Sequence, residues 1–204
     1  MPIIAQNHGG TNVAPIAPGS YAARCYSMVQ IGTITENIAG TDKELHKVRI
    51  TWELPNETAV FKEENGEQPR VISEEYTLSL NEKANLRKML QSWRGKAFTD
   101  KEADAFDITV LVGKPCMLSI SQKESKKGNT FSYISAVSLL PKGMECPPQI
   151  NASQVLSFDT WDDELFQSLP DFIKDKIKGS KEYNAMQNAD NNDVIHDLDG
   201  NPIF

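Results

Sequence analysis

The sequence has few of the patterns that enzymes and membrane proteins require. Its three cysteines, Cys25, Cys116 and Cys146, lack metal-ligand spacing, and its three histidines are too scattered for a metal site or a catalytic triad. It contains no glycine-rich phosphate loop and no apolar run of membrane-spanning length. We therefore expect a protein that is not an enzyme, has no metal or cofactor, and does not associate with a membrane.

The cysteines also indicate the compartment. An odd number of cysteines in a chain without a signal peptide favours free, mostly buried thiols in a reducing environment. We expect a cytoplasmic protein.

Positive charge is scarce overall, with a formal net charge of -7. The deficit is uneven, because residues 1–144 carry 17 Lys and Arg against 16 Asp and Glu, whereas residues 145–204 carry 4 against 12. Charge asymmetry between segments is more informative than the total. Most of the acidity therefore belongs to the last third, and the rest of the chain is nearly neutral.

A chain of 204 residues is long enough for one sizeable core plus an appendage. Composition divides it into a flexible N-terminal arm that could dock on the core, a main domain, a linker with short helices, and a polar tail that we expect to be disordered. The helices are expected to pack on the domain or on a neighbouring subunit of a homo-oligomer. The expected boundaries are 1–17, 18–143, 144–183 and 184–204.

Alternating and β-rich runs predict five strands, the first broken at Gly32 by a bulge. In the second strand Val48, Ile50, Trp52 and Leu54 share one face, which favours a core position for Trp52, while Glu53 falls on the outward face. The expected strands span residues 21–35, 46–54, 70–80, 114–122 and 130–140.

A helical stretch separates the third and fourth strands. Apolar residues recur at helical spacing over residues 82–93, and Thr99 followed by Glu102 is typical of a capping box that begins a second short helix. Three strands, a helical insertion and two more strands are the order of a five-stranded Greek-key barrel, the OB-fold. We therefore predict a mainly β protein of OB fold, with a short helical C-terminal extension and a disordered acidic tail.

Two stretches resemble a known family. The runs at 85–99 (NLRKMLQSWRGKAFT) and 111–118 (LVGKPCML), with Pro18-Gly19-Ser20-Tyr21 upstream, look like a family of phage- and prophage-encoded proteins suspected to bind single-stranded DNA. The resemblance covers about residues 18–142. It implies an OB fold, a role in phage replication or recombination, and the cytoplasm of a bacterial host.

Sequence-tolerant binding of single strands requires basic groups for phosphates and exposed aromatic rings for bases. The strands and hairpin loops that line an OB-fold binding face carry both types of residue. The alternative for the two aromatics of the last strand is a place in the core. The predicted DNA-binding residues are Arg24, Tyr26, Lys47, Arg49, Lys123, Lys126, Lys127, Phe131 and Tyr133.

The C-terminal residues suggest a second binding function. The end of the chain, DLDGNPIF, is similar to the acidic tip of bacterial single-strand DNA-binding proteins, although Pro and Ile are transposed relative to that tip. The resemblance implies recruitment of replication or recombination proteins; the alternative is a solubilising tail. The predicted partner-binding residues are Asp197, Asp199, Pro202, Ile203 and Phe204.

The sequence thus predicts a single-stranded DNA-binding protein that does not read sequence. The first alternative is an OB-type protein-interaction or assembly module that does not bind DNA, because the chain lacks a marked basic stripe. A weaker alternative is an accessory enzyme of DNA processing.

Overall fold

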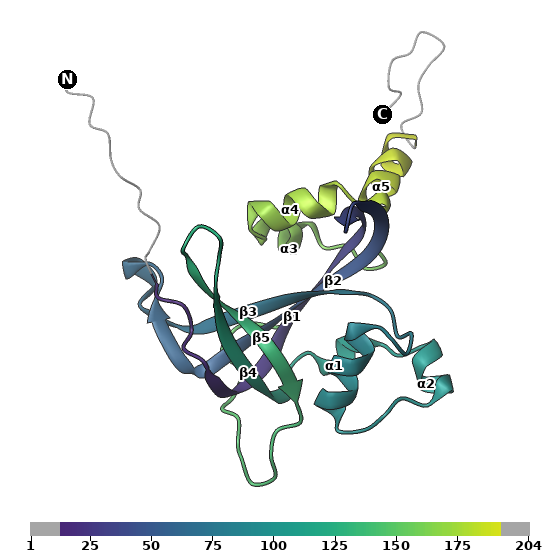
Figure 1. Ribbon diagram of the computed structural model, residues 1–204. Coiled ribbons are helices and arrows are strands. Elements are labelled where there is room, and N and C mark those ends of the chain that lie inside the picture. Colours follow the sequence, from purple (N-terminus) through teal and green to yellow (C-terminus); the bar gives the residue numbers. More distant parts are fainter. Residues whose placement is uncertain (1–12, 193–204) are drawn as a thin grey trace, which may run out of the picture.

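A computed structural model describes residues 13–192, which form one mainly β structure (Figure 1). Five strands pair antiparallel in the order β3-β2-β1-β4-β5, and a short sixth strand pairs with β1 in parallel. The sheet stays open, because no pairing joins β3 to β5 among the described residues. The strands are β1 (Gly19–Ile38), β2 (Thr41–Val60), β3 (Glu67–Thr77), β4 (Pro115–Glu124), β5 (Thr130–Ser138) and β6 (Gln154–Leu156).

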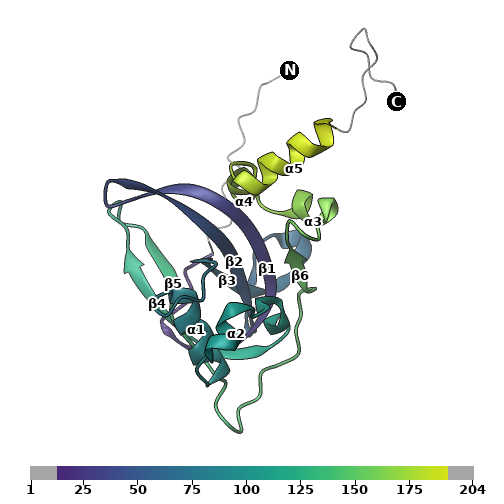
Figure 2. The same cartoon turned by 90° about the vertical axis from the view of Figure 1, so that its right-hand side faces the viewer.

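The five predicted strands are confirmed. The short strand β6 is not predicted from the sequence. Two helices lie between β3 and β4, as predicted, and three follow β6; the two groups lie at opposite ends of the sheet (Figure 2). Thr99 caps the second helix in the predicted capping box. The helices are α1 (Asn85–Arg94), α2 (Asp100–Asp104), α3 (Asp163–Ser168), α4 (Asp171–Lys178) and α5 (Lys181–Asn192), with 3-10 turns at Glu63–Asn65 and Ile108–Leu111.

The main core lies between the curved sheet and α1. Trp52 is fully buried, as its position in the alternating run predicts, and its ring centroid lies 5.8 Å from that of Trp93 on α1. Leu86, Met89 and Leu90 complete the buried face of this helix. The helical stretch between β3 and β4 therefore belongs to the core of the sheet.

A second core lies on the other face of β1. Val29 and Ile31 point into it, and α3 and α4 cover them with Phe166, Leu169, Ile173 and Ile177. The prediction that short C-terminal helices pack on the sheet is confirmed.

Helix α5 corrects the predicted disorder after residue 183. It continues to Asn192 because its first turn is anchored: the Glu182 carboxylate accepts hydrogen bonds of 2.6 Å from both the backbone N–H and the hydroxyl of Thr33. The predicted bulge at Gly32 is confirmed, and its φ of 89° suits glycine. A Cβ there would lie 2.7 Å from the Ser180 side chain, so α5 can approach only a glycine this closely.

The segment after β5 is tied to the sheet by two charged side chains. Arg24 donates to the carbonyls of Gly113, Cys146 and Pro147 at 2.8–3.1 Å. Glu53, predicted to face outward, is fully buried because residues 150–151 cover it. Its carboxylate accepts from Ile150 N, Asn151 N and Asn151 Nδ2 at 2.7–2.8 Å.

Two segments fill the seam between β3 and β5. At one end, the Ile16 side chain is buried and its carbonyl accepts hydrogen bonds from Gln122 and Ser132, which confirms that the end of the N-terminal arm docks. At the other end, α1 packs between the two strands, and the Leu139 N–H donates to the Ser92 carbonyl. The free edges of the sheet are thereby partly covered.

Candidate nucleic-acid interface

The hairpin formed by β4 and β5 brings five of the predicted DNA-binding residues together. Lys123 pairs with Phe131 across the two strands, and Ser121 pairs with Tyr133, so the two rings share one face of the hairpin. The Lys123 ammonium lies 5.1 Å from the centroid of each ring. Lys126 and Lys127 are exposed at the tip.

The alternative that these two rings belong to the core is wrong. Phe131 is 41% exposed, Tyr133 is half-buried, and neither contributes to either core cluster. The opposite face of the hairpin packs inward, where Gln122 and Ser132 contact Ile16. The outer face therefore presents two aromatic surfaces and three cationic side chains to the solvent.

The two predicted basic residues of β2 lie elsewhere and are ion-paired. Lys47 pairs with Glu36, and Arg49 lies 3.0 Å from Glu75. The Arg49 guanidinium also covers the Phe172 ring at 5.4 Å, so α4 shields it. Their charges are largely balanced within the protein.

The ion pairs of Glu75 with Arg49 and Lys176 change the pKa of its carboxyl group. Burial alone would raise the pKa of Glu75, but hydrogen bonds and charge from Lys176 and Arg49 bring that pKa below its usual value. The Lys176 ammonium lies 2.8 Å from the carboxylate. Helix α4 is thus held to β3 by a pair that stays ionised at neutral pH.

The two predicted residues of β1 do not join the hairpin group. Arg24 holds the segment after β5 through the carbonyl contacts given above, which engage all of its nitrogens. Tyr26 occupies the bulge between Cys25 and Ser27 and is half-buried; burial, and then the charge of Glu53, raises its pKa. Arg24 therefore has a structural role, and we do not retain it as a contact to DNA. Tyr26 lies outside the hairpin group, and its contact with DNA stays a prediction.

The predicted partner-binding residues of the C-terminal tip, Asp197, Asp199, Pro202, Ile203 and Phe204, lie outside the described residues.

Within residues 13–192, no helix has the length and hydrophobicity needed to cross a membrane. The same range contains no group of three His, Cys, Asp or Glu side chains placed to hold a metal ion. The three cysteines are free thiols, and burial raises the pKa of Cys25 to about 12.

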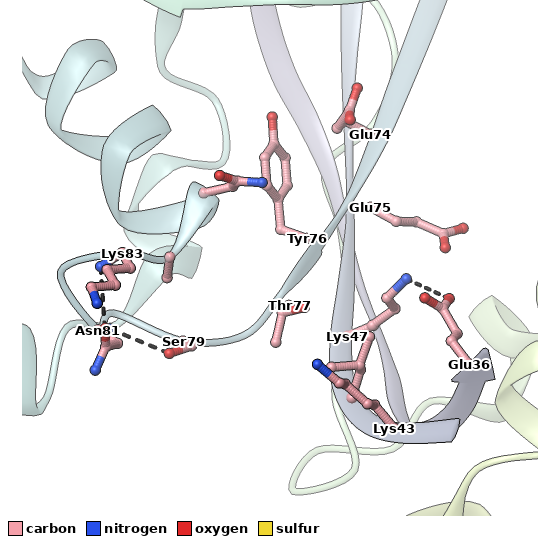
Figure 3. A pocket seen from close by; sticks show the side chains of 13 residues that line it. Glu36, Lys43, Lys47, Glu74, Glu75, Tyr76, Thr77, Ser79, Asn81 and Lys83 are labelled. Carbon is pink, nitrogen blue, oxygen red and sulfur yellow. Dashed lines mark hydrogen bonds and ion pairs between the residues drawn. The ribbon is translucent and has the colours of Figure 1, made fainter. Parts of the chain in front are cut away.

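A groove lies between the β1–β2 hairpin and the loop that leads from β3 to α1 (Figure 3). Its volume is about 770 Å³. Lys43 and Lys47 line one side and Lys83 the other, and β3 forms the floor with Glu74, Glu75 and Tyr76. We call this cavity the β3 groove.

The β3 groove continues toward β5 and the hairpin. A second cavity of about 370 Å³ lies between β3, α1 and β5, and it shares Glu74, Tyr76 and Asn85 with the groove. Burial raises the pKa of Glu74, and the positive charge of Lys123 offsets part of that rise. Lys123 of the hairpin is therefore close enough to influence a carboxylate on the floor of the groove. The aromatic face of the hairpin and the β3 groove are therefore neighbours.

Sequence reasoning missed most of this groove. Lys43, Tyr76 and Lys83 come from separate segments of the chain. Lys43 lies opposite Lys83 only because the β1–β2 hairpin is curved. The one available signal was local: Thr77, Ser79, Asn81, Lys83 and Asn85 form a polar run between a strand and a helix.

Comparisons of the chain with models of protein families, with curated proteins and with solved structures found no match.

Proposed function

We propose that this chain binds single-stranded DNA without strong dependence on sequence and acts in phage or prophage replication or recombination. The observation that carries the proposal is the outer face of the β4–β5 hairpin, where Phe131 and Tyr133 are accessible and Lys123 lies over both rings. Stacking on aromatic side chains tolerates every base, because each base has a π face. Lys126 and Lys127 supply charge for phosphates at the same site.

The strand order supports an OB-type barrel. The order β3-β2-β1-β4-β5, with helices between β3 and β4, agrees with the order expected of an OB-fold, except that β3 and β5 are not hydrogen-bonded to each other. Segment 13–18 and α1 occupy the seam instead of hydrogen bonds between the strands. In that fold the loop between the last two strands borders the binding face, which is where the hairpin cluster lies.

A protein-interaction or assembly module remains the second candidate. The observation that favours it is the internal pairing of Lys47 and Arg49 with Glu36 and Glu75, which lowers the free positive charge near the groove. Anisotropy of a labelled oligothymidine, titrated with protein at two salt concentrations, separates the candidates. No binding at either salt concentration would reject the DNA function and favour the module.

The salt dependence of binding should identify the hairpin lysines as phosphate contacts. For single strands, log K is expected to fall against log salt with a slope of about -0.7 per phosphate neutralised. Replacing Lys126 and Lys127 together with alanine should therefore flatten the slope by up to about 1.4. The matched control replaces the exposed Lys62 and Lys101, which lie outside the hairpin, and should leave the slope unchanged. Equal slopes for both double variants would remove the hairpin tip from the interface.

We further propose that the C-terminal residues compete with DNA. Residues 193–204 carry Asp193, Asp197 and Asp199 and no Lys or Arg, so they can be attracted to the groups that attract phosphates. A tethered competitor acts at high effective concentration. Deleting residues 193–204, which leaves α5 intact, should tighten DNA binding at low salt. The gain should shrink as the Debye length falls from about 30 Å at 0.01 M to about 8 Å at 0.15 M.

Two variants separate competition by charge from recruitment of a partner. Replacing the three Asp residues with Asn should reproduce the gain of the deletion at unchanged chain length. Phe204→Ala should leave DNA affinity unchanged and abolish capture of replication or recombination proteins, because the short apolar segment of Pro202, Ile203 and Phe204 beside acidic residues suits a partner pocket with a basic rim. Unchanged capture by Phe204→Ala would reduce this segment to a solubilising one.

A further inference from the structure

The Glu74 carboxylate on the floor of the β3 groove has no hydrogen-bond or ion-pair partner within residues 13–192. Its neighbour Glu75 is held by Arg49 and Lys176, and Glu36 is held by Lys47. Figure 3 shows Glu74 at the end of the groove near Tyr76, separate from the Lys47–Glu36 pair. The half-buried Glu74 carboxylate is thus not held by a protein donor among the described residues, and it can accept hydrogen bonds from a ligand in the groove.

The surroundings of Glu74 suit a planar polar ligand. The β3 groove and the adjoining cavity have volumes of about 770 and 370 Å³, and binding sites for small molecules typically span about 300–1,000 Å³. Tyr76 and Asn85 line both cavities, and Lys88 lines the second. A base placed here would have an aromatic neighbour and amide and ammonium donors within the same walls.

The chemistry of a carboxylate selects among the four bases. Two acceptor oxygens are best satisfied by two adjacent N–H groups, and charge-assisted bidentate pairs of this kind are strong. The Watson–Crick edge of guanine offers them as N1–H and the 2-amino group, and this edge is accessible in a single strand. Thymine presents one N–H between two carbonyl oxygens, which a carboxylate repels.

We propose that the β3 groove is a guanine-binding subsite, in which Glu74 accepts from N1–H and the 2-amino group of an unpaired guanine. Asn85 and Lys88 line the adjoining cavity and carry the N–H donors that the guanine O6 oxygen would need. Burial, and to a lesser extent the charge of Glu75, raises the pKa of Glu74, so the carboxylate lies in a partly desolvated part of the groove. This subsite rests on the proposed binding of single-stranded DNA and adds a base preference to the sequence-tolerant hairpin.

The test compares three oligonucleotides of equal length by fluorescence anisotropy at pH 8. The first is oligothymidine, the second carries guanine at every fifth position, and the third carries hypoxanthine, which lacks only the 2-amino group, at the same positions. One bidentate base contact corresponds to about a five-fold to about a 150-fold difference in affinity. The guanine oligonucleotide should bind tighter than oligothymidine by a factor in this range, and the hypoxanthine oligonucleotide should lose most of that gain.

Glu74→Gln provides the residue-level test, because an amide can accept from only one of the two guanine donors. The variant should retain affinity for oligothymidine and lose the preference for guanine, whereas Glu64→Gln, which removes an equal charge from an exposed position outside the groove, should keep the preference. Binding of all three oligonucleotides with equal affinity, or a preference that survives in Glu74→Gln, would overturn the guanine subsite alone. Failure of the wild-type protein to bind any of them would overturn the DNA function and the subsite together.

Discussion

Alanine at Phe131 or Tyr133 is expected to weaken binding of oligothymidine by about five-fold to about 150-fold for each substitution. This range follows from the roughly 1–3 kcal/mol that one stacked base contributes to binding. Both rings lie on the outer face of the hairpin and outside the two core clusters, so their removal opens no cavity. The thermal midpoint of each variant should therefore stay close to that of the wild-type protein.

Phe172→Ala is the matched control for these two substitutions. Phe172 is 55% exposed, comparable with Phe131, but it lies on α4 beside Arg49 and away from the hairpin. Its removal should change neither DNA affinity nor the preference among bases. If Phe131→Ala and Tyr133→Ala bind DNA as well as Phe172→Ala does, the rings do not stack on bases and the hairpin face belongs to another partner.

Glu53→Ala is expected to lower the free energy of unfolding by at least about 1.5–3 kcal/mol, the range for the loss of one hydrogen bond to a charged group. The Glu53 side chain is fully buried, and its carboxylate accepts three hydrogen bonds from Ile150 and Asn151. Alanine would leave all three donors without their acceptor and release residues 150–151 from the sheet. Equilibrium unfolding in urea measures the loss, and limited proteolysis after residue 143 should become faster.

Two further substitutions serve as comparisons for the loss of stability in Glu53→Ala. Glu53→Gln keeps one acceptor oxygen but turns an N–H₂ group toward a donor, so its loss of stability should be intermediate. Glu64→Ala removes an exposed carboxylate whose nearest cation, Lys62, is 3.8 Å away, and its effect should stay within about 0.5 kcal/mol. A Glu53→Ala protein as stable as Glu64→Ala would show that the segment is held without this carboxylate.

The sequence predicts those elements whose signal is local and periodic. Alternation over Val48, Ile50 and Trp52 predicts both β2 and the burial of Trp52, and the Thr99 and Glu102 pair predicts the start of α2. Both predictions depend only on neighbours in the chain. The structure confirms them.

The failures concern residues whose surroundings come from distant segments. Glu53 has the alternation of an outward residue, but the irregular chain at 150–151 covers it, and such a path leaves no periodic signal. Helix α5 is too polar to predict from composition, and it is held by contacts of Glu182 with Thr33 on β1. The state of Glu74 is equally unpredictable from the sequence, because only the fold shows that no side chain within residues 13–192 pairs with its carboxylate.

The central position of β1 has a consequence for folding during synthesis. Its first half pairs with β4 and its middle with β6, so both partners bind along the same edge of a strand that is synthesised before them. Only β2, on the other edge, follows it directly in the chain. Contacts between residues far apart in the sequence form slowly, because a long loop must close first. Strand β1 must therefore wait with one edge unpaired until residues 115–124 and 154–156 have been translated.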